Sequence, residues 1–213
     1  MNIGQDIYVL KEYVTRHRRW FHMHPELDFQ VAKTREYIIA ELTELGVDSV
    51  EVFAGGTRGV IYADNTHSTL AFRADMDALE LQEQTGAEYQ STVSDRMHAC
   101  GHDGHMAILL GIAKWAVKNR SSLRHNIVLI FQPAEETIGG ARPMIEEGVL
   151  KAPKPDAIFA FHIFPHIDQG KVGVKAGPLM AQTTEFDIEL EGRTAHGAMP
   201  HKGIDTIVAA SNL

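Results

Sequence analysis

The chain has 213 residues, a formal net charge of -8, 44% hydrophobic residues and 23% charged residues, which is typical of a globular protein long enough to bury a core. The acidic balance, with no basic stripe, argues against a nucleic-acid partner. No apolar stretch reaches the ~20 residues needed to cross a bilayer, and we see one cysteine and no signal-peptide pattern, so we expect no membrane partner and a reducing, cytoplasmic location.

Two amphipathic helices are predicted in the N-terminal part of the chain. Apolar residues recur at helical spacing around residues 9–14 and again around residues 37–45. Gly46 follows the second segment, and we expect it to cap that helix because glycine readily adopts the left-handed conformation of a helix C-cap.

Four short apolar runs then predict β-strands, at residues 59–63, 69–73, 127–131 and 157–161. The last three are nearly continuous rather than alternating, as expected for strands that are covered on both faces. A helix is predicted at about residues 104–118, between the second and third strands. Strands separated by helices imply an α/β fold with a mixed, largely parallel sheet flanked by helices.

The pattern changes in the last part of the chain. Apolar and polar residues alternate over residues 183–191, which predicts a half-exposed strand. A helix is expected from about Ile204 and is predicted to run on to Leu213. We therefore expect residues 1–182 to form the N-terminal part of one domain. Residues 183–213 are expected to begin a second, α+β domain that is cut short.

Polar side chains gather at one kind of place in this predicted fold, the strand ends and the start of the central helix. Ligands of open α/β sheets bind beyond the carboxyl ends of the strands, so we expect these side chains to lie together. The segments concerned are Asp75-Met76-Asp77, Cys100-Gly101-His102, Glu135-Glu136 and His162.

Cys100 is the only cysteine, so it cannot form a disulfide within the chain. Gly101 lets the backbone turn tightly enough for Cys100 and His102 to face one point, which favours a metal site over a buried structural thiol. A thiolate binds borderline cations such as zinc well and could bridge two of them. Asp103 or Asp75 could orient the His102 ring from behind.

Other acidic and histidine residues near this motif have two interpretations each. Asp77, like Asp75, either ends a strand in a turn or belongs to the site. His98 and His105 are expected to be structural or to support the metal ligands. His22 and His24 lie at a helix end, where the helix dipole favours histidine, and we interpret them as structural.

Glu135 and Glu136 form the most informative pair. Neighbouring residues of an extended chain point to opposite sides, so one carboxylate can face a metal while the other faces substrate. Crowding of two carboxylates also raises one pKa, which suits a proton shuttle. His162, at the end of an apolar strand, is the natural third ligand. His196 is either an ordinary loop histidine or a donor that a mobile lid brings over the site.

The motifs together resemble the amidohydrolase branch of the aminoacylase-type metallopeptidases. That branch includes N-acyl-amino-acid amidohydrolases, hippurate hydrolases, auxin-conjugate hydrolases and N-acetyldiaminopimelate deacetylases. The resemblance runs along essentially the whole chain and is carried by residues 18–27, 72–79, 97–105, 132–136 and 196–201. It implies a catalytic α/β domain with two divalent metal ions, zinc or manganese with cobalt or nickel as alternatives, and an inserted lid domain that forms a homodimer.

Carried over residue by residue, the resemblance implies that four residues are metal ligands: Cys100, His102, Glu136 and His162. It implies that Glu135 is the general base and that His196 is the lid histidine that reaches the partner subunit's site. Glu80 stands where the family usually has proline. Family members continue well beyond this length, so we expect a C-terminally truncated chain that lacks the rest of the lid and a further metal-binding histidine.

The predicted function is hydrolysis of the amide bond of small N-acyl amino acids by a metal-activated water, with Glu135 as the base. Two alternatives stay open. The chain could be a catalytically incompetent, metal-binding fragment of such an enzyme. It could also be a dipeptidase or aminopeptidase of the same clan, which assays with acylated and free-amine substrates would distinguish.

Overall fold

The computed structural model describes residues 3–64, 68–181, 184 and 186–213. It divides into two compact units, Met1–Pro165 and His166–Leu213. The predicted domain boundary between residues 182 and 183 falls on residues outside the described set and stays a prediction. No helix in the described part of the chain has both the length and the apolarity needed to cross a membrane.

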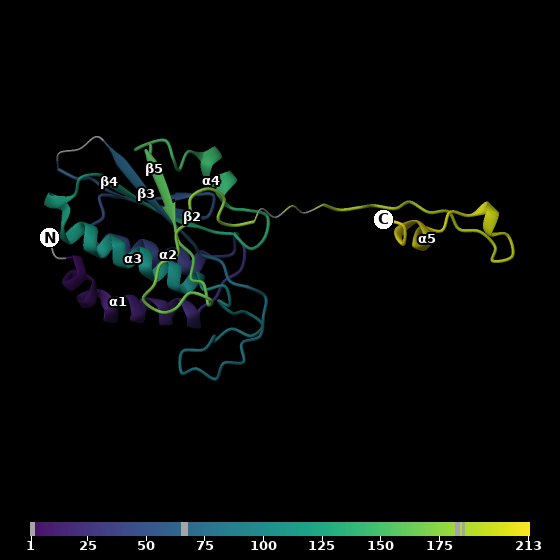
Figure 1. The fold of residues 1–213 in the computed structure, drawn as a ribbon, viewed down its shortest axis with the longest axis horizontal. Coiled ribbons are helices and arrows are strands. Elements are labelled where there is room, and N and C mark those ends of the chain that lie inside the picture. The colour runs from purple at the N-terminus through teal and green to yellow at the C-terminus, as the bar shows by residue number, and fades with distance from the viewer. Residues whose placement is uncertain (1–2, 65–67, 182–183, 185) are drawn as a thin grey trace. The chain divides into compact units, whose positions relative to one another are not determined.

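The first unit is built on one mixed sheet of five strands (Figure 1). Their spatial order is β1-β2-β4-β3-β5. The central β4 pairs with β3 in parallel and with β2 in antiparallel, β3 also pairs with β5 in parallel, and β1 pairs with β2 in antiparallel. The strands are β1 (Ser49–Phe53), β2 (Gly56–Ile61), β3 (Thr69–Asp75), β4 (Asn126–Gln132) and β5 (Ala157–Ala160).

Helices cover both faces of the sheet, which confirms the predicted fold class. α1 (Ile3–Met23), α2 (Ala32–Leu45) and α3 (His102–Lys118) pack with the larger core cluster, and α4 (Ala141–Glu147) lies with the smaller one. Along β4 the side chains alternate between the two clusters, so all seven of its residues are buried. Gly46 caps α2 in the left-handed conformation, with φ of 79°, as predicted.

Three details of the first unit differ from the sequence-based expectation. β1 and α4 were not predicted, because each is short and amphipathic in a segment rich in polar residues. β5 was expected to be covered on both faces, but three of its four residues are exposed. The reason is its position: β5 is an edge strand that pairs only with β3 in the described sheet. An apolar run alone does not distinguish a central strand from an edge strand.

The second unit contains little regular structure. A short 3-10 helix spans Pro200–Lys202, and α5 spans Thr206–Ala210. Asp205 caps α5 by accepting hydrogen bonds from the Ile207 and Val208 amides, and the helix ends before a turn instead of running on to Leu213 as expected. Of the predicted strand at residues 183–191, the described residues are not in a strand, because none of them has a pairing partner.

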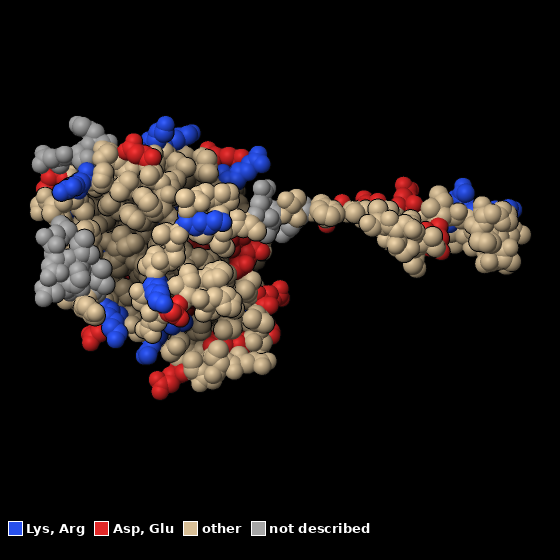
Figure 2. Space-filling view, in the orientation of Figure 1, with Lys and Arg blue, Asp and Glu red and all other residues tan. Residues whose placement is uncertain are grey.

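Charged side chains of both signs are dispersed over the visible face of the first unit. On the face shown in Figure 2, lysine and arginine side chains are interspersed with aspartate and glutamate and do not gather into one basic patch. This agrees with the net charge of -8.

His17 makes the first unit sensitive to acid. The ring is fully buried beside the Tyr37 hydroxyl, and burial, followed by the charges of Arg16 and Lys114, lowers its pKa from 6.5 to about 4. Below pH 6.5 the unfolded chain therefore binds a proton that the folded chain does not, and stability falls until about pH 4. We expect His17→Gln to flatten this part of the pH dependence of the free energy of unfolding, measured by urea denaturation. Equal slopes for the variant and the parent would contradict it.

Gly140 is predicted to be intolerant of any side chain. A Cβ atom there would lie 2.1 Å from the Pro133 carbonyl oxygen, whereas a Cβ at the neighbouring Gly139 would meet nothing within 4 Å. Gly140→Ala should therefore displace the loop after β4 and lower the free energy of unfolding by about 1–3 kcal/mol, the usual cost of overpacking. Gly139→Ala is the matched control, because its cost is confined to a left-handed backbone with φ of 83°. Equal loop chemical shifts in the two variants would refute the clash.

Candidate metal centre

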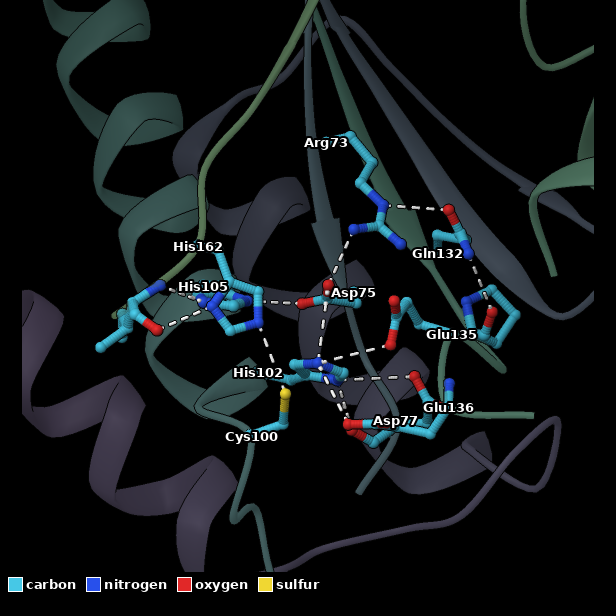
Figure 3. A network of polar contacts seen from close by, with 12 residues as sticks. Arg73, Asp75, Asp77, Cys100, His102, His105, Gln132, Glu135, Glu136 and His162 are labelled. Carbon is cyan, nitrogen blue, oxygen red and sulfur yellow. Dashed lines mark hydrogen bonds and ion pairs between the residues drawn. The ribbon is translucent and has the colours of Figure 1, made fainter. Parts of the chain in front are cut away.

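The parallel strands β3, β4 and β5 end at the same edge of the sheet, and the polar segments meet there (Figure 3). Asp75 is the last residue of β3, Glu135 and Glu136 follow β4, and His162 follows β5. The N-terminus of α3 brings His102, with Cys100 just ahead of it. The sequence-predicted segments of the first unit are therefore brought together.

His102 is oriented by the backbone after β3. Its Nδ1 donates a hydrogen bond of 2.8 Å to the Asp77 carbonyl oxygen, which leaves Nε2 as the nitrogen with a free lone pair. Burial would lower the pKa of His102, but the carboxylates of Asp77, Asp75 and Glu136 raise it. The Asp77 side chain also accepts the Glu136 backbone N–H at 3.0 Å and so fixes the loop after β4.

The free His102 nitrogen faces several carboxylates without a hydrogen bond to any of them. Its Nε2 lies 3.6 Å from Asp75 Oδ2, 3.6 Å from Glu136 Oε1 and 3.9 Å from Glu135 Oε2. Among the described residues, neither His102 Nε2 nor Glu136 Oε1 has a hydrogen-bond partner, although both are buried. A nitrogen lone pair and carboxylate oxygens that face one another with no proton between them could all be satisfied by a bound cation.

Cys100 and His162 extend this set on the other side of His102 in the view of Figure 3. The His162 Nδ1 donates to the Ile163 carbonyl at 2.7 Å, so its Nε2 has the free lone pair and lies 3.4 Å from Cys100 Sγ. Cys100, His102 and His162 each offer a ligand atom within 4.8 Å of the others, and His102, Glu135 and Glu136 do the same. Burial, and then the Glu136 carboxylate, raises the pKa of the Cys100 thiol to about 12.

His105 holds neighbouring residues of the site in place and has no ring nitrogen left free for a metal ion. Its Nε2 accepts the Ile163 backbone N–H at 2.9 Å, so its Nδ1 carries the proton that is donated to Asp75 Oδ1 at 2.6 Å. Arg73 Nη1 donates to the other Asp75 oxygen at 2.7 Å. Burial would raise the pKa of Asp75, but the His105 hydrogen bond and the nearby positive charges lower it to about 2.

The structure places two residues differently from the expectation that Asp103 or Asp75 orients His102. Asp103 is hydrogen-bonded to His22 and Arg18, and the residue that orients His102 is Asp77. Asp75 faces His102 at 3.6 Å but is hydrogen-bonded to His105. Asp77 orients His102 through its backbone carbonyl, and the side-chain pattern of the sequence carries no signal for such a contact.

The remaining histidines singled out in the sequence lie in different surroundings. His24 Nδ1 is 2.7 Å from the Trp20 carbonyl oxygen at the end of α1, as expected for a structural residue. His98 is buried, neither of its ring nitrogens has a partner among the described residues, and burial lowers its pKa to about 4. His196 belongs to the second unit, where its Nδ1 accepts the Ala198 N–H at 3.1 Å. Its proposed role at the site stays a prediction.

Comparisons with known proteins agree with this picture. The profile of Peptidase family M20/M25/M40 matches residues 71–211. N-acetyldiaminopimelate deacetylase of Bacillus subtilis (strain 168) is 44% identical over 198 residues, which are 92% of this chain and 52% of that protein. The chain thus spans about half the length of the curated relatives it matches.

Solved structures give the same result. A Bacillus subtilis protein, YXEP, described as a dinuclear metal binding peptidase from the M20 family, is 40% identical, with a TM-score of 0.75 over 79% of this chain and 48% of that one. A protein of methicillin-resistant Staphylococcus aureus is 33% identical, with a TM-score of 0.83 over 100% of this chain and 57% of that one. The matched profile covers more than half of the sequence. The chain therefore belongs to peptidase family M20/M25/M40.

Proposed function

We propose that this protein is a metal-dependent amidohydrolase that cleaves the amide bond of N-acyl amino acids. The observation that carries the proposal is the unpaired His102 Nε2, which faces the Glu135, Glu136 and Asp75 carboxylates at 3.6–3.9 Å. The curated relatives are named N-acetyldiaminopimelate deacetylases, which supports a small acylated amino acid as the substrate class.

Four residues would hold two divalent ions in this proposal: Cys100, His102, Glu136 and His162. Thiolate, imidazole and carboxylate donors suit zinc, and we propose zinc or manganese as the resident metal, with cobalt and nickel as further candidates. The similarity to a dinuclear metal binding peptidase supports two ions. When bound, such ions lower the pKa of a coordinated water and polarise a carbonyl oxygen.

Glu135 would be the general base in this site. Its side chain is 41% exposed, whereas Glu136 is 21% exposed, so Glu135 is the more accessible to substrate and water. It accepts a proton from the attacking water as the new C–O bond forms at the acyl carbon. It then donates that proton to the nitrogen as the C–N bond breaks, releasing a carboxylic acid and a free amino acid.

We further propose the roles that involve the rest of the protein. His196 would donate to the carbonyl oxygen as negative charge develops there, from a lid formed by the residues after 182. The lid would form a homodimer, and the protein would act in the cytoplasm, where a single reduced cysteine is stable. The test is an N-acyl-amino-acid panel, run on this chain and on a version extended by the downstream reading frame. Absence of hydrolysis by both metal-loaded proteins would refute the proposal.

Replacement of the base should separate chemistry from metal binding. We expect Glu135→Gln to lower kcat by about 10²–10⁴-fold in the extended protein, because general acid–base catalysis contributes that much, while metal content stays the same. Steady-state assays and metal analysis of the same sample measure both. Glu146→Gln is the matched control, since Glu146 is an exposed residue that forms an ion pair with Arg142 on α4. Full turnover of Glu135→Gln with bound metal would exclude Glu135 as the base.

The loss of activity on metal removal should be reversible, and metal binding should depend on Cys100. Dialysis against a chelator is expected to abolish hydrolysis by the extended protein, and zinc, manganese, cobalt or nickel should restore it. Cys100→Ser should bind less metal than the parent in elemental analysis, because a hydroxyl is a poorer ligand than a thiolate for these ions. Unchanged metal content in Cys100→Ser would remove Cys100 from the ligand set.

A further inference from the structure

A second group of buried charges lies behind the turn that carries Cys100 and His102. His22, near the end of α1, is 2.8 Å from Asp103 Oδ2 through its Nδ1 and 3.2 Å from Glu83 Oε1 through its Nε2. All three residues are buried, with relative exposures of 5% for His22, 1% for Asp103 and 7% for Glu83. His22 therefore bridges two carboxylates from separate parts of the chain.

The contacts on both ring nitrogens favour a charged ring. A neutral imidazole has one N–H donor, and ionised carboxylates only accept, so two such hydrogen bonds need both ring nitrogens protonated. The Asp103 hydrogen bond raises the pKa of His22 against the effect of burial. Burial would raise the pKa of Glu83, but hydrogen bonds from the Ser91 backbone, the Thr85 hydroxyl and His22 lower it.

This bridge joins three segments that are far apart in sequence. Glu83 lies in the long irregular loop after β3, where it also accepts hydrogen bonds from the Ser91 backbone and the Thr85 hydroxyl. Asp103 lies in the first turn of α3, directly after His102. Arg18 Nε donates to the same Asp103 oxygen at 3.1 Å, so α1 contacts this turn twice.

The turn has no side-chain cap of its own. Gly101 is the N-cap residue of α3, has a left-handed backbone with φ of 90°, and provides no side-chain hydrogen bond to cap the helix. A glycine turn without a cap has little local stiffness. Nevertheless, the ligand atoms of Cys100 and His102 lie within 4.8 Å of each other, and both must stay in place to bind one ion.

We propose that His22 is a positioning residue: held through both ring nitrogens between Glu83 and Asp103, it fixes the first turn of α3 and so preorganises Cys100 and His102 for metal binding. The part of the inference that concerns metal binding rests on the proposed function. The part that concerns the ordering of the α3 turn rests on the geometry of the bridge alone. Residues that support metal ligands from behind typically change metal affinity by about 10–100-fold when replaced.

The test compares His22→Gln with the parent 213-residue chain by two measurements. Glutamine can donate through one end only, so its carbonyl oxygen would face one of the two carboxylates. In the metal-free chain, hydrogen exchange of peptides covering residues 83–91 and 100–105 should become faster. In a cobalt titration followed by thiolate-to-cobalt absorption, affinity should fall about 10–100-fold.

His24→Gln is the matched control. His24 lies two residues further along, just after α1, and its Nδ1 contacts the Trp20 carbonyl of α1 rather than the α3 turn. We expect parent-like exchange in both peptides and parent-like cobalt affinity. An equal loss in His24→Gln and His22→Gln would show a general weakening of the end of α1 and would overturn the proposal.

Asp103→Asn breaks the same bridge from its other side and keeps the test decisive if His22→Gln does not fold. If Asp103 acts through His22, the losses of the two variants should not add in the double variant. Parent-like exchange and cobalt affinity in either folded single variant would refute the positioning role. If the parent chain shows no thiolate-to-cobalt absorption, the proposed metal site fails, and hydrogen exchange still decides whether His22 holds the turn.

Discussion

The parallel pairing of β3 with β4 and β5 is the constraint on which the site depends. In this register Asp75 lies opposite Gln132, so the last residue of β3 is beside the residue that precedes the Pro133 turn. Arg73 lies opposite Ala160, which puts the end of β5 and the following His162 at the same edge. A slip by one residue would turn every side chain of a strand to the opposite face and disperse the acidic and histidine residues.

Backbone carbonyls decide which histidines are free to act. His102 and His162 each donate from Nδ1 to a carbonyl oxygen, which fixes the proton there and leaves Nε2 as an acceptor. His105 has both nitrogens engaged, one by the Ile163 amide and one by Asp75. All three imidazole side chains could bind a metal ion. Their hydrogen bonds show which of them have a nitrogen free to do so, His102 and His162, and which one holds other residues in place, His105.

Much of this could be predicted from the sequence because apolar runs and polar strand ends are local signals. They indicated β3, β4 and α3, and therefore the edge where Asp75, Cys100 and Glu136 meet. The partners of Asp103 could not be predicted, because contacts between α1 and α3 join residues more than 80 positions apart. The sequence of one segment does not encode which strands lie beside it. For this reason the exposure of the edge strand β5 and the lack of strand pairing at residues 186–191 could not be predicted either.

The open side of β5 has a consequence for handling the protein. Ile158 and Phe159 are 50% and 49% exposed on a strand with an unpaired backbone edge in the described sheet. Edges of this kind are templates on which another chain can add a strand. Concentrated solutions of this chain should therefore form edge-to-edge aggregates, and a lysine in place of Ile158 should make the chain easier to keep dispersed.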